Sequence, residues 1–419
     1  MFVAIGNTPR DYAWGSTSAI AEFRGVEPSG SPEAELWLGA HAGSPARVHD
    51  AASVGHDDLA AWIAADPARA LGPALAAQGA RLPFLLKLLA AAEPLSLQAH
   101  PTPEQARAGF AREEAEGIPV TAYDRNYRDA FHKPELVVAV SDEFDALSGF
   151  RPLDEVAGVL AVLREADAAT DEPQPGALDL LAARLGTADP LRDTVEWLLR
   201  DGRGEDTGEA TWVVERVTAL AASDLARDSE YAASFETVTR LAEVYPGDPG
   251  IVISLLLNRV VLRRGEALYL AAGNIHAYLS GLGIELMAAS DNVLRGGLTP
   301  KHIDVGELLD VLDFRPIAPP RLAPEQVGSS LQAFRPDVPD FVLYRAEFGG
   351  SADAARVPLT GPAIVLAEGD AIRLRGAHGE AELARGEAVY VTPDEGALDV
   401  TGQGIAWIAT TGAPAASGA

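Results

Sequence analysis

Cysteine is absent from all 419 residues. A disulfide framework, a thiolate zinc site, an iron–sulfur cluster and a cysteine nucleophile are therefore excluded. Any bound metal must be held by histidine, carboxylate or amide ligands. Lysine is scarce too, because 30 of the 33 basic residues are arginine. The remaining lysines, Lys87, Lys133 and Lys301, are candidates for positions that need a flexible, titratable ammonium group, with chance as the alternative.

Positive charge is also in short supply, since 61 acidic and 33 basic residues give a formal net charge of −28. Neither nucleic acid nor an anionic membrane is an expected partner, because both need clustered Lys and Arg. Long hydrophobic runs are lacking as well. The longest near the middle, residues 251–262, is interrupted by Asn258 and Arg259 and is too short to span a bilayer. Residues 1–15 do not resemble a signal peptide, so a cytoplasmic location is expected.

The patterns along the chain predict a mainly β protein with a helical insertion. Residues 1–150 mix short β-like runs with turns, apart from a helical pattern at 58–92. Residues 152–245 contain amphipathic helical stretches and end at Pro-Gly punctuation. The β pattern then returns as far as about residue 411, and the tail at 413–419 is expected to be disordered.

One short segment occurs twice. Arg264-Gly-Glu-Ala-Leu-Tyr-Leu270 reappears at 385–391 with two Leu→Val changes. Both copies have the form of a turn followed by a strand, which predicts two copies of one β-barrel unit unless the biased composition produced the match by chance. His276 lies eleven residues after the glycine of the first copy, whereas Ala397 takes that offset in the second. The second copy is therefore expected to be structural.

Residues 95–100 alternate strictly between apolar and polar side chains. In a strand, Ser96, Gln98 and His100 share one face. That face suits the lining of a barrel cavity, although an edge strand with its polar face in water fits the same pattern. This segment therefore predicts a polar strand without deciding between a cavity and solvent.

Lys133 and Glu135 point the same way if their segment is extended. Such a pair is usually solvated. The apolar run at 136–140 that follows is typical of a buried strand, and burial would make the pair costly unless it has a function.

Residues 273–301 bring together further reactive side chains. His276 lies near glycines, although a lone histidine is more often structural than a ligand. Glu285, Asp291, Arg295 and Lys301 follow around an Arg-Gly-Gly turn, where glycine lets the backbone approach a ligand closely.

Together, these segments supply two imidazoles, a carboxylate and an amide oxygen, from Gln98, His100, Glu135 and His276. The set suits Zn²⁺ or a similar divalent ion and leaves room for water or substrate. All three lysines and Arg295 lie in the same segments. A metal beside several cations implies an oxygen-rich anionic ligand, for which a phosphate is the simplest candidate.

The chain resembles the type I mannose-6-phosphate isomerases, zinc enzymes of the cupin superfamily. The matching segments lie in order along the chain: Tyr12-Ala-Trp-Gly15, 34–41, 82–89, 94–101, 132–135, 273–276 and 285–295. The resemblance implies two cupin-like jelly-roll barrels plus an α-helical domain. The implied divisions are a catalytic barrel at 1–150 and 251–315, a helical insertion at 151–250 and a second barrel without metal at 316–412.

The resemblance also implies roles for individual residues. One zinc ion per chain is bound by Gln98, His100, Glu135 and His276. Catalytic roles fall to Arg295, Lys133, Asp291 and Glu285. Contacts to phosphate or sugar fall to Lys87, Ser96 and Lys301. His132 corresponds to a family residue proposed in proton transfer, but the alternation places it on the opposite face from Glu135.

The implied reaction is the reversible isomerisation of D-mannose 6-phosphate to D-fructose 6-phosphate through a zinc-stabilised cis-enediol. The proton-transfer base is left open between Lys133, a carboxylate such as Glu285 and a zinc-bound hydroxide. The alternatives are a non-catalytic sugar-phosphate-binding cupin and a metal-dependent oxygenase on the same barrel. An added Gln98 ligand and the ring of cations argue against the oxygenase. A phosphorylated hexose is the implied partner, and a monomer is expected.

Overall fold

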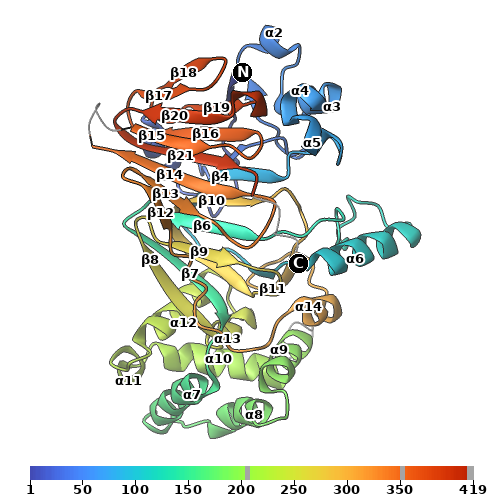
Figure 1. The fold of residues 1–419 in the computed structure, drawn as a ribbon. Coiled ribbons are helices and arrows are strands. Elements are labelled where there is room, and N and C mark those ends of the chain that lie inside the picture. The colour runs from blue at the N-terminus through green and yellow to red at the C-terminus, as the bar shows by residue number, and fades with distance from the viewer. Residues whose placement is uncertain (203–207, 350–353, 413–419) are drawn as a thin grey trace, which may run out of the picture.

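A computed structural model describes residues 1–202, 208–349 and 354–412 (Figure 1). Its strands form three antiparallel sheets, and all but one of its longer helices gather at one end of the molecule. The prediction of a mainly β chain with a helical insertion is confirmed. The tail at 413–419 lies outside the described residues. Among the described residues, no helix has the length and apolar character needed to cross a membrane.

A nine-stranded sheet is built around β10, which pairs with β4, β5, β6 and β7. Strand β10 runs for 13 residues, so its two ends reach different neighbours. The strands of this sheet are β2 (Glu35–Leu38), β4 (Phe84–Ala91), β5 (Leu97–Ala99), β6 (Glu135–Ala139), β7 (Glu143–Phe150), β8 (Leu257–Arg263), β9 (Ala267–Leu270), β10 (His276–Ala288) and β11 (Leu294–Gly297).

Strand β4 corrects the helical prediction for residues 58–92. Short helices do occupy the first part of that range, but all eight residues of β4 are buried in an extended strand. A continuous apolar run that is buried on both faces has no alternation to distinguish it from a buried helix. Lys87 is the polar exception inside this run, and its side chain is 7% exposed.

The helical block lies below the sheets in Figure 1 and follows β7 directly. Its helices bury apolar stripes in one core that also receives Leu97, Ala99 and Ile275 from the sheet beside the site. The block therefore supports the strands that carry the polar face. Its helices are α7 (Leu153–Ala168), α8 (Pro175–Leu185), α9 (Pro190–Asp201), α10 (Glu209–Ala221), α11 (Asp224–Arg227), α12 (Ala232–Val244) and α13 (Gly250–Ser254).

The remaining helices are short, apart from α6, which projects from the side of the molecule in Figure 1. A capping box formed by Thr102 and Gln105 begins α6 just after β5. These helices are α1 (Ala19–Arg24), α2 (Ala51–Val54), α3 (Leu59–Ala65), α4 (Pro67–Leu71), α5 (Pro73–Ala76), α6 (Pro103–Ala115), α14 (Val305–Val311) and the 3₁₀ turn η1 (Pro393–Glu395).

The C-terminal strands form an eight-stranded and a four-stranded sheet at the other end. The N-terminal strands β1 and β3 belong to the eight-stranded sheet, where β1 pairs with β19. The domain boundaries implied by the sequence stay a prediction. These strands are β1 (Phe2–Gly6), β3 (Arg47–Val48), β12 (Glu325–Gly328), β13 (Leu331–Phe334), β14 (Val342–Phe348), β15 (Ala354–Pro358), β16 (Ala363–Glu368), β17 (Ile372–Arg375), β18 (Glu380–Leu383), β19 (Ala388–Val391), β20 (Ala397–Thr401) and β21 (Gly404–Thr410).

The repeated segment adopts the same local structure in both places. Gly265 and Gly386 both have positive φ and both donate their N–H to the strand that pairs with the repeat. In each copy the glutamate after the glycine accepts a backbone N–H three residues earlier. His276 begins β10, and Ala397 begins β20. The two copies therefore share a turn, a strand and a spacing, while the duplication of one β-barrel unit stays a prediction.

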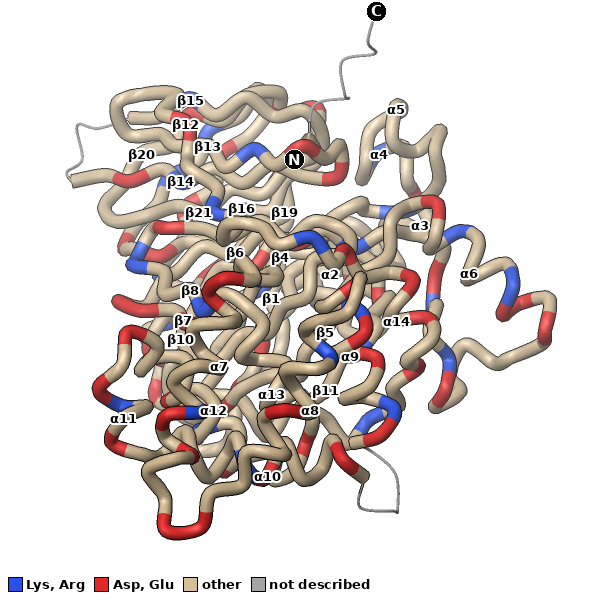
Figure 2. Tube along the Cα trace, turned by 90° about the horizontal axis from the view of Figure 1, so that it is seen from below, with Lys and Arg blue, Asp and Glu red and all other residues tan. Residues whose placement is uncertain are grey.

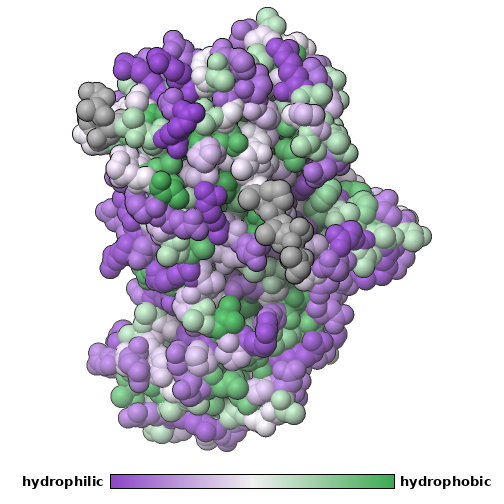
Figure 3. All heavy atoms as spheres, viewed as in Figure 1, coloured by the Kyte–Doolittle hydropathy of each residue, from purple (hydrophilic) through white to green (hydrophobic). Residues whose placement is uncertain are grey.

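The exterior carries the excess of negative charge. Acidic positions outnumber basic ones along the trace in Figure 2. Figure 3 shows hydrophilic residues spread over the visible face, with hydrophobic ones scattered between them. The acidic composition is consistent with an ordinary solvated surface and leaves the interior cations to be explained.

Candidate active site

Strand β10 places several polar side chains on the same side of the nine-stranded sheet. Gln98 lies on β5, between β10 and β11. It is paired with His276 of β10 on one side and with Arg295 of β11 on the other. Further along β10, Glu285 lies opposite Lys87. Side chains that are directly opposite in antiparallel strands lie on the same face, so the sheet itself brings these groups together.

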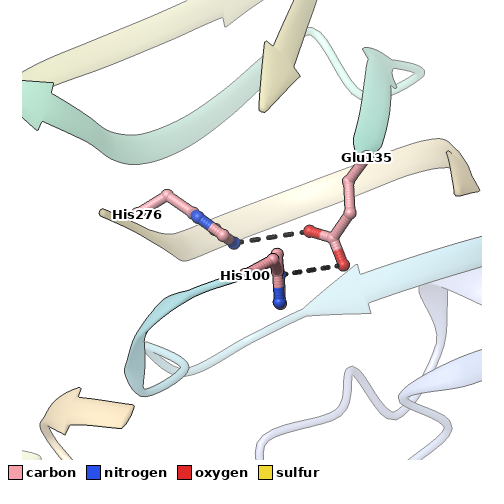
Figure 4. A group of neighbouring side chains, drawn as sticks. All are labelled: His100, Glu135 and His276. Carbon is pink, nitrogen blue, oxygen red and sulfur yellow. Dashed lines mark ion pairs between the residues drawn. The ribbon is translucent and has the colours of Figure 1, made fainter. Parts of the chain in front are cut away.

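His100, Glu135 and His276 converge at one point (Figure 4). The Nε2 atoms of His100 and His276 lie 3.4 and 3.3 Å from the two carboxylate oxygens of Glu135. One potential ligand atom from each residue lies within 4.8 Å of the others. All three side chains are almost completely buried, and they come from β10, from β6 and from the residue after β5.

The hydrogen bonds of the two histidines leave the Nε2 atom of each ring available to a metal. The Nδ1–H of His100 donates to the carbonyl of Asn292 at 2.8 Å, and that of His276 donates to the carbonyl of Asn274 at 3.1 Å. Each buried Nε2 then carries a lone pair and finds no hydrogen-bond partner in the part of the chain that the structure describes. Two lone pairs facing a carboxylate need a cation between them. These residues therefore fit a divalent metal ion.

Carboxylates and lysines alternate around this cluster. Lys133 Nζ lies 2.7 Å from Glu135. Lys87 Nζ lies 2.9 Å from Glu285 and 3.3 Å from Glu35. Three carboxylates against two ammonium groups leave this buried assembly one negative charge, which also favours a bound cation.

Burial and neighbouring charges shift the pKa values of the assembly. Burial alone would lower the pKa of Lys87, but the charges of Glu285 and Glu35 outweigh it and raise the pKa. Burial raises the pKa of Glu285, and nearby carboxylates add to the effect against the opposing charge of Lys87. Burial, aided by the charge of Lys133, lowers the pKa of His100 to about 4. His100 is therefore neutral, as a metal ligand must be.

Three cations gather elsewhere in the same cavity. Burial and the charge of Arg128 lower the pKa of Arg295. Burial and the charges of Arg295 and Arg128 likewise lower the pKa of Lys301. The ion pairs of the described residues include none of these three side chains, so no carboxylate in direct contact offsets their mutual repulsion. Such a cluster is suited to a multiply charged anion.

One cavity of about 520 Å³ contains both the carboxylate–lysine assembly and the three cations. Glu135 lines this cavity, whereas the buried side chains of His100 and His276 are not among its lining residues. The predicted residues that line it are Lys87, Ser96, Gln98, Lys133, Glu135, Glu285, Asp291, Arg295 and Lys301. Asp291 is half exposed, and His41 Nε2 lies 3.3 Å from its carboxylate.

His132 does not line this cavity. Its Nε2 contacts Asp340 Oδ2 at 2.8 Å, on the side of the loop that faces the C-terminal strands. The alternation argument had placed it opposite Glu135, and the structure agrees with that argument. A direct part for His132 in proton transfer finds no support in this geometry.

Several cavity residues had no predicted role. Tyr278 follows His276 by two positions, so strand alternation could have placed it on the same face. Its hydroxyl is buried without a hydrogen-bond partner among the described residues. Glu35 begins β2, and alternation alone does not reveal that it pairs with Lys87. Arg128 lies in a loop, where no periodic signal exists.

Comparisons with known proteins agree with this site. A family model of the phosphomannose isomerase type I catalytic domain matches residues 2–153. Mannose-6-phosphate isomerase of Escherichia coli (strain K12) is 38% identical, with 95% of this chain and 96% of that protein covered. The Homo sapiens protein of the same name is 31% identical over 85% of this chain and 84% of its own.

Solved structures give the same family. A zinc-bound crystal structure of mannose 6-phosphate isomerase superposes with a TM-score of 0.84 at 33% identity, covering 98% of this chain and all of the other. The apo form from Salmonella typhimurium has the same TM-score and identity and is covered over 99% of its length.

Proposed function

The chain belongs to the type I phosphomannose isomerase family, and we propose that the cavity beside β10 interconverts D-mannose 6-phosphate and D-fructose 6-phosphate. The observation that carries this assignment is the pairing, in one cavity, of a buried His–Glu–His cluster with three uncompensated cations. The His–Glu–His cluster suits the metal of a sugar isomerase, and the three cations suit a phosphate group.

Zinc is the cofactor, and His100, Glu135 and His276 would hold it. Gln98 completes the ligand set, because register places it beside His276 and its side chain lines the cavity. When bound, the metal acts as a Lewis acid that stabilises negative charge on the sugar oxygens, an effect worth several kcal/mol.

Arg128, Arg295 and Lys301 bind the substrate at its phosphate end. Burial and, after it, repulsion by neighbouring cations lower the pKa values of Arg295 and Lys301, and a bound dianion relieves that repulsion. Arg295 also lies opposite Gln98 in the register. It is therefore placed between the phosphate end and the metal end, where its permanent charge stabilises a developing enediolate. Ser96 and Asp291 contact the sugar from the cavity wall.

Glu285 carries the proton between C1 and C2. Isomerisation removes a proton from one carbon and returns it to the next, so the group responsible needs a pKa near the working pH. Burial raises the pKa of Glu285 in that direction, and its carboxylate lines the cavity. Lys133 Nζ lies 2.7 Å from Glu135 and holds that carboxylate in place.

The test of the function is a coupled assay that follows fructose 6-phosphate formed from mannose 6-phosphate. The zinc-loaded protein is expected to turn over the substrate, to lose turnover on chelation and to regain it when zinc is added back. A zinc-replete sample that binds mannose 6-phosphate without turnover would establish the non-catalytic alternative instead.

Two single variants separate the candidate bases. Glu285→Gln removes the titrating group and is expected to lower kcat at least about 100-fold, the usual size of a general-base contribution. Lys133→Arg keeps the charge, so its kcat is expected to stay within about tenfold of the original. Zinc content, measured in both variants, is expected to be unchanged. The reverse ranking of the two kcat values would assign the proton to Lys133.

A single chain contains every residue of the proposed site, and we propose that the protein works as a monomer. Light scattering coupled to size-exclusion chromatography is expected to give a mass near 43.9 kDa. A dimer mass at assay concentrations would contradict this.

A further inference from the structure

Asn292 lies in the turn between β10 and β11 and is completely buried. Its side chain is used entirely on one neighbouring segment. Oδ1 accepts the backbone N–H groups of Arg128 at 2.7 Å and of Asp129 at 3.3 Å. Nδ2 donates to the carbonyls of Asp129 and Phe131, both at 2.8 Å. Nδ2 also lies 3.3 Å from Asp129 Oδ1. Two accepted bonds and donation by both N–H groups saturate an asparagine side chain.

The segment held in this way is part of the proposed machinery. It carries Arg128, which lines the cavity, and it leads within a few residues to Lys133 and Glu135. It has no helical or sheet hydrogen bonds of its own at 128–131. Inside the segment the Asp129 carboxylate accepts the N–H of Phe131, and Ser290 and the backbone of Asp291 bond to the segment from outside. The side chain of Asn292 supplies four further bonds to the main chain of the segment.

The main chain of Asn292 contacts the metal end of the site. Its carbonyl accepts the Nδ1–H of His100. One residue thus touches both a metal ligand and the loop that carries a phosphate-binding cation. A displacement of the loop relative to this turn would move Arg128 away from the sheet that holds the metal ligands and Arg295.

Asn274 provides a natural comparison. Its carbonyl accepts the Nδ1–H of the other histidine, His276, so its main chain plays the corresponding part. Its side chain, also buried, accepts a hydrogen bond from Ser148 Oγ instead and none of its bonds involves the 128–131 segment. The two asparagines therefore share the histidine contact and differ in the contact with the loop.

We propose that Asn292 is a positioning residue that fixes the distance between the phosphate-binding Arg128 and the metal centre. The proposal rests on the function proposed above, because it takes Arg128 to contact the substrate phosphate. A misplacement of about 1 Å in such a group can cost as much as 100-fold in an enzyme's efficiency. The effect should fall on phosphate recognition, since the carbonyl that orients His100 is main chain and survives substitution.

Asn292→Ala is expected to raise KM for mannose 6-phosphate about tenfold and to weaken inhibition by inorganic phosphate by a similar factor. Zinc content is expected to be unchanged, and kcat to stay within about threefold. Asn274→Ala is expected to keep KM and phosphate inhibition within about twofold. A merely structural role for Asn292 would not single out phosphate recognition in this way.

A double-variant cycle with Arg128→Gln tests whether Asn292 acts through Arg128. In the Arg128→Gln background, Asn292→Ala is expected to change KM less than twofold. A further tenfold rise there would overturn the proposal, as would an unchanged KM in folded, zinc-loaded Asn292→Ala. Asn292→Ser carries the same expectations should the alanine variant fail to fold. Failure of the proposed function is a separate result, because it would appear as missing turnover in the unsubstituted protein.

Discussion

A Glu135→Gln variant is expected to lose its zinc and to fall at least about a thousandfold in turnover of mannose 6-phosphate. Both carboxylate oxygens of Glu135 face histidine nitrogens, and Lys133 lies 2.7 Å from one of them. The neutral amide would leave a dication beside an unbalanced ammonium group. Losing several kcal/mol of transition-state stabilisation corresponds to the expected loss, at 1.36 kcal/mol per factor of ten. Metal analysis by mass spectrometry and the coupled assay measure the two effects.

The matched control is Glu395→Gln. Glu395 is another buried glutamate and is 1% exposed. It lies in η1, between β19 and β20, and accepts the backbone N–H of His378. This variant is expected to retain one zinc ion per chain and normal turnover. Stoichiometric zinc in folded Glu135→Gln would contradict the expectation that the negative charge of Glu135 is needed to hold the ion.

The parts of the site that could be predicted are pairs of residues that belong to the same extended segment. Gln98 and His100 belong to an alternating segment, and Lys133 and Glu135 are two positions apart, so a period of two places each pair on one face. The regular strand is shorter than predicted, since β5 covers only residues 97–99. The polar face survives because Leu97 and Ala99 are buried on the opposite side.

The parts that were not predictable depend on register between distant strands. The ammonium group of Lys87 lies between the carboxylates of Glu35 and Glu285, 52 and 198 residues away along the chain. Lys87 also lines the cavity, so the contact with phosphate or sugar implied by the resemblance stays a prediction. No local sequence pattern predicts the two carboxylate contacts of Lys87. The helix predicted across β4 failed for a related reason, because burial on both faces removes the alternation that identifies a strand.

Residues in loops could not be predicted from sequence periodicity. Arg128 and Asn292 both lie outside regular elements, so neither period applies to them. Their importance emerges only from hydrogen bonds that join segments more than 160 residues apart. The resemblance to a family had already included Asn292 within a matching segment, but it attached no chemistry to the residue.

Lys87→Met is expected to lower the free energy of unfolding by about 3–5 kcal/mol, the usual cost of removing one partner from a buried ion pair. The variant would leave Glu35 and Glu285, whose side chains are 9% and 3% exposed, without their shared cation. Their mutual repulsion would add to the cost of burying each charge. Urea denaturation of the zinc-loaded protein, followed by circular dichroism, measures the change.

Lys301→Met gives the matched control, since it makes the same substitution in the same cavity. The neighbours that shift the pKa of Lys301 are chiefly Arg295 and Arg128, so removing its charge relieves repulsion. Its stability is expected to stay within about 1 kcal/mol, whereas its KM for mannose 6-phosphate is expected to rise about tenfold. If Lys87→Met instead kept its stability and raised KM, Lys87 would be the phosphate contact predicted from the sequence.

A second substitution distinguishes charge balance from lost packing in the Lys87 variant. Adding Glu285→Gln to Lys87→Met removes one of the two stranded carboxylates, while Glu35 keeps the hydrogen bond from Trp37 Nε1 at 3.1 Å. The double variant is therefore expected to be at least about 1 kcal/mol more stable than Lys87→Met alone. Equal or lower stability of the double variant would mean that the methionine side chain, and not the unpaired carboxylates, destabilises the fold.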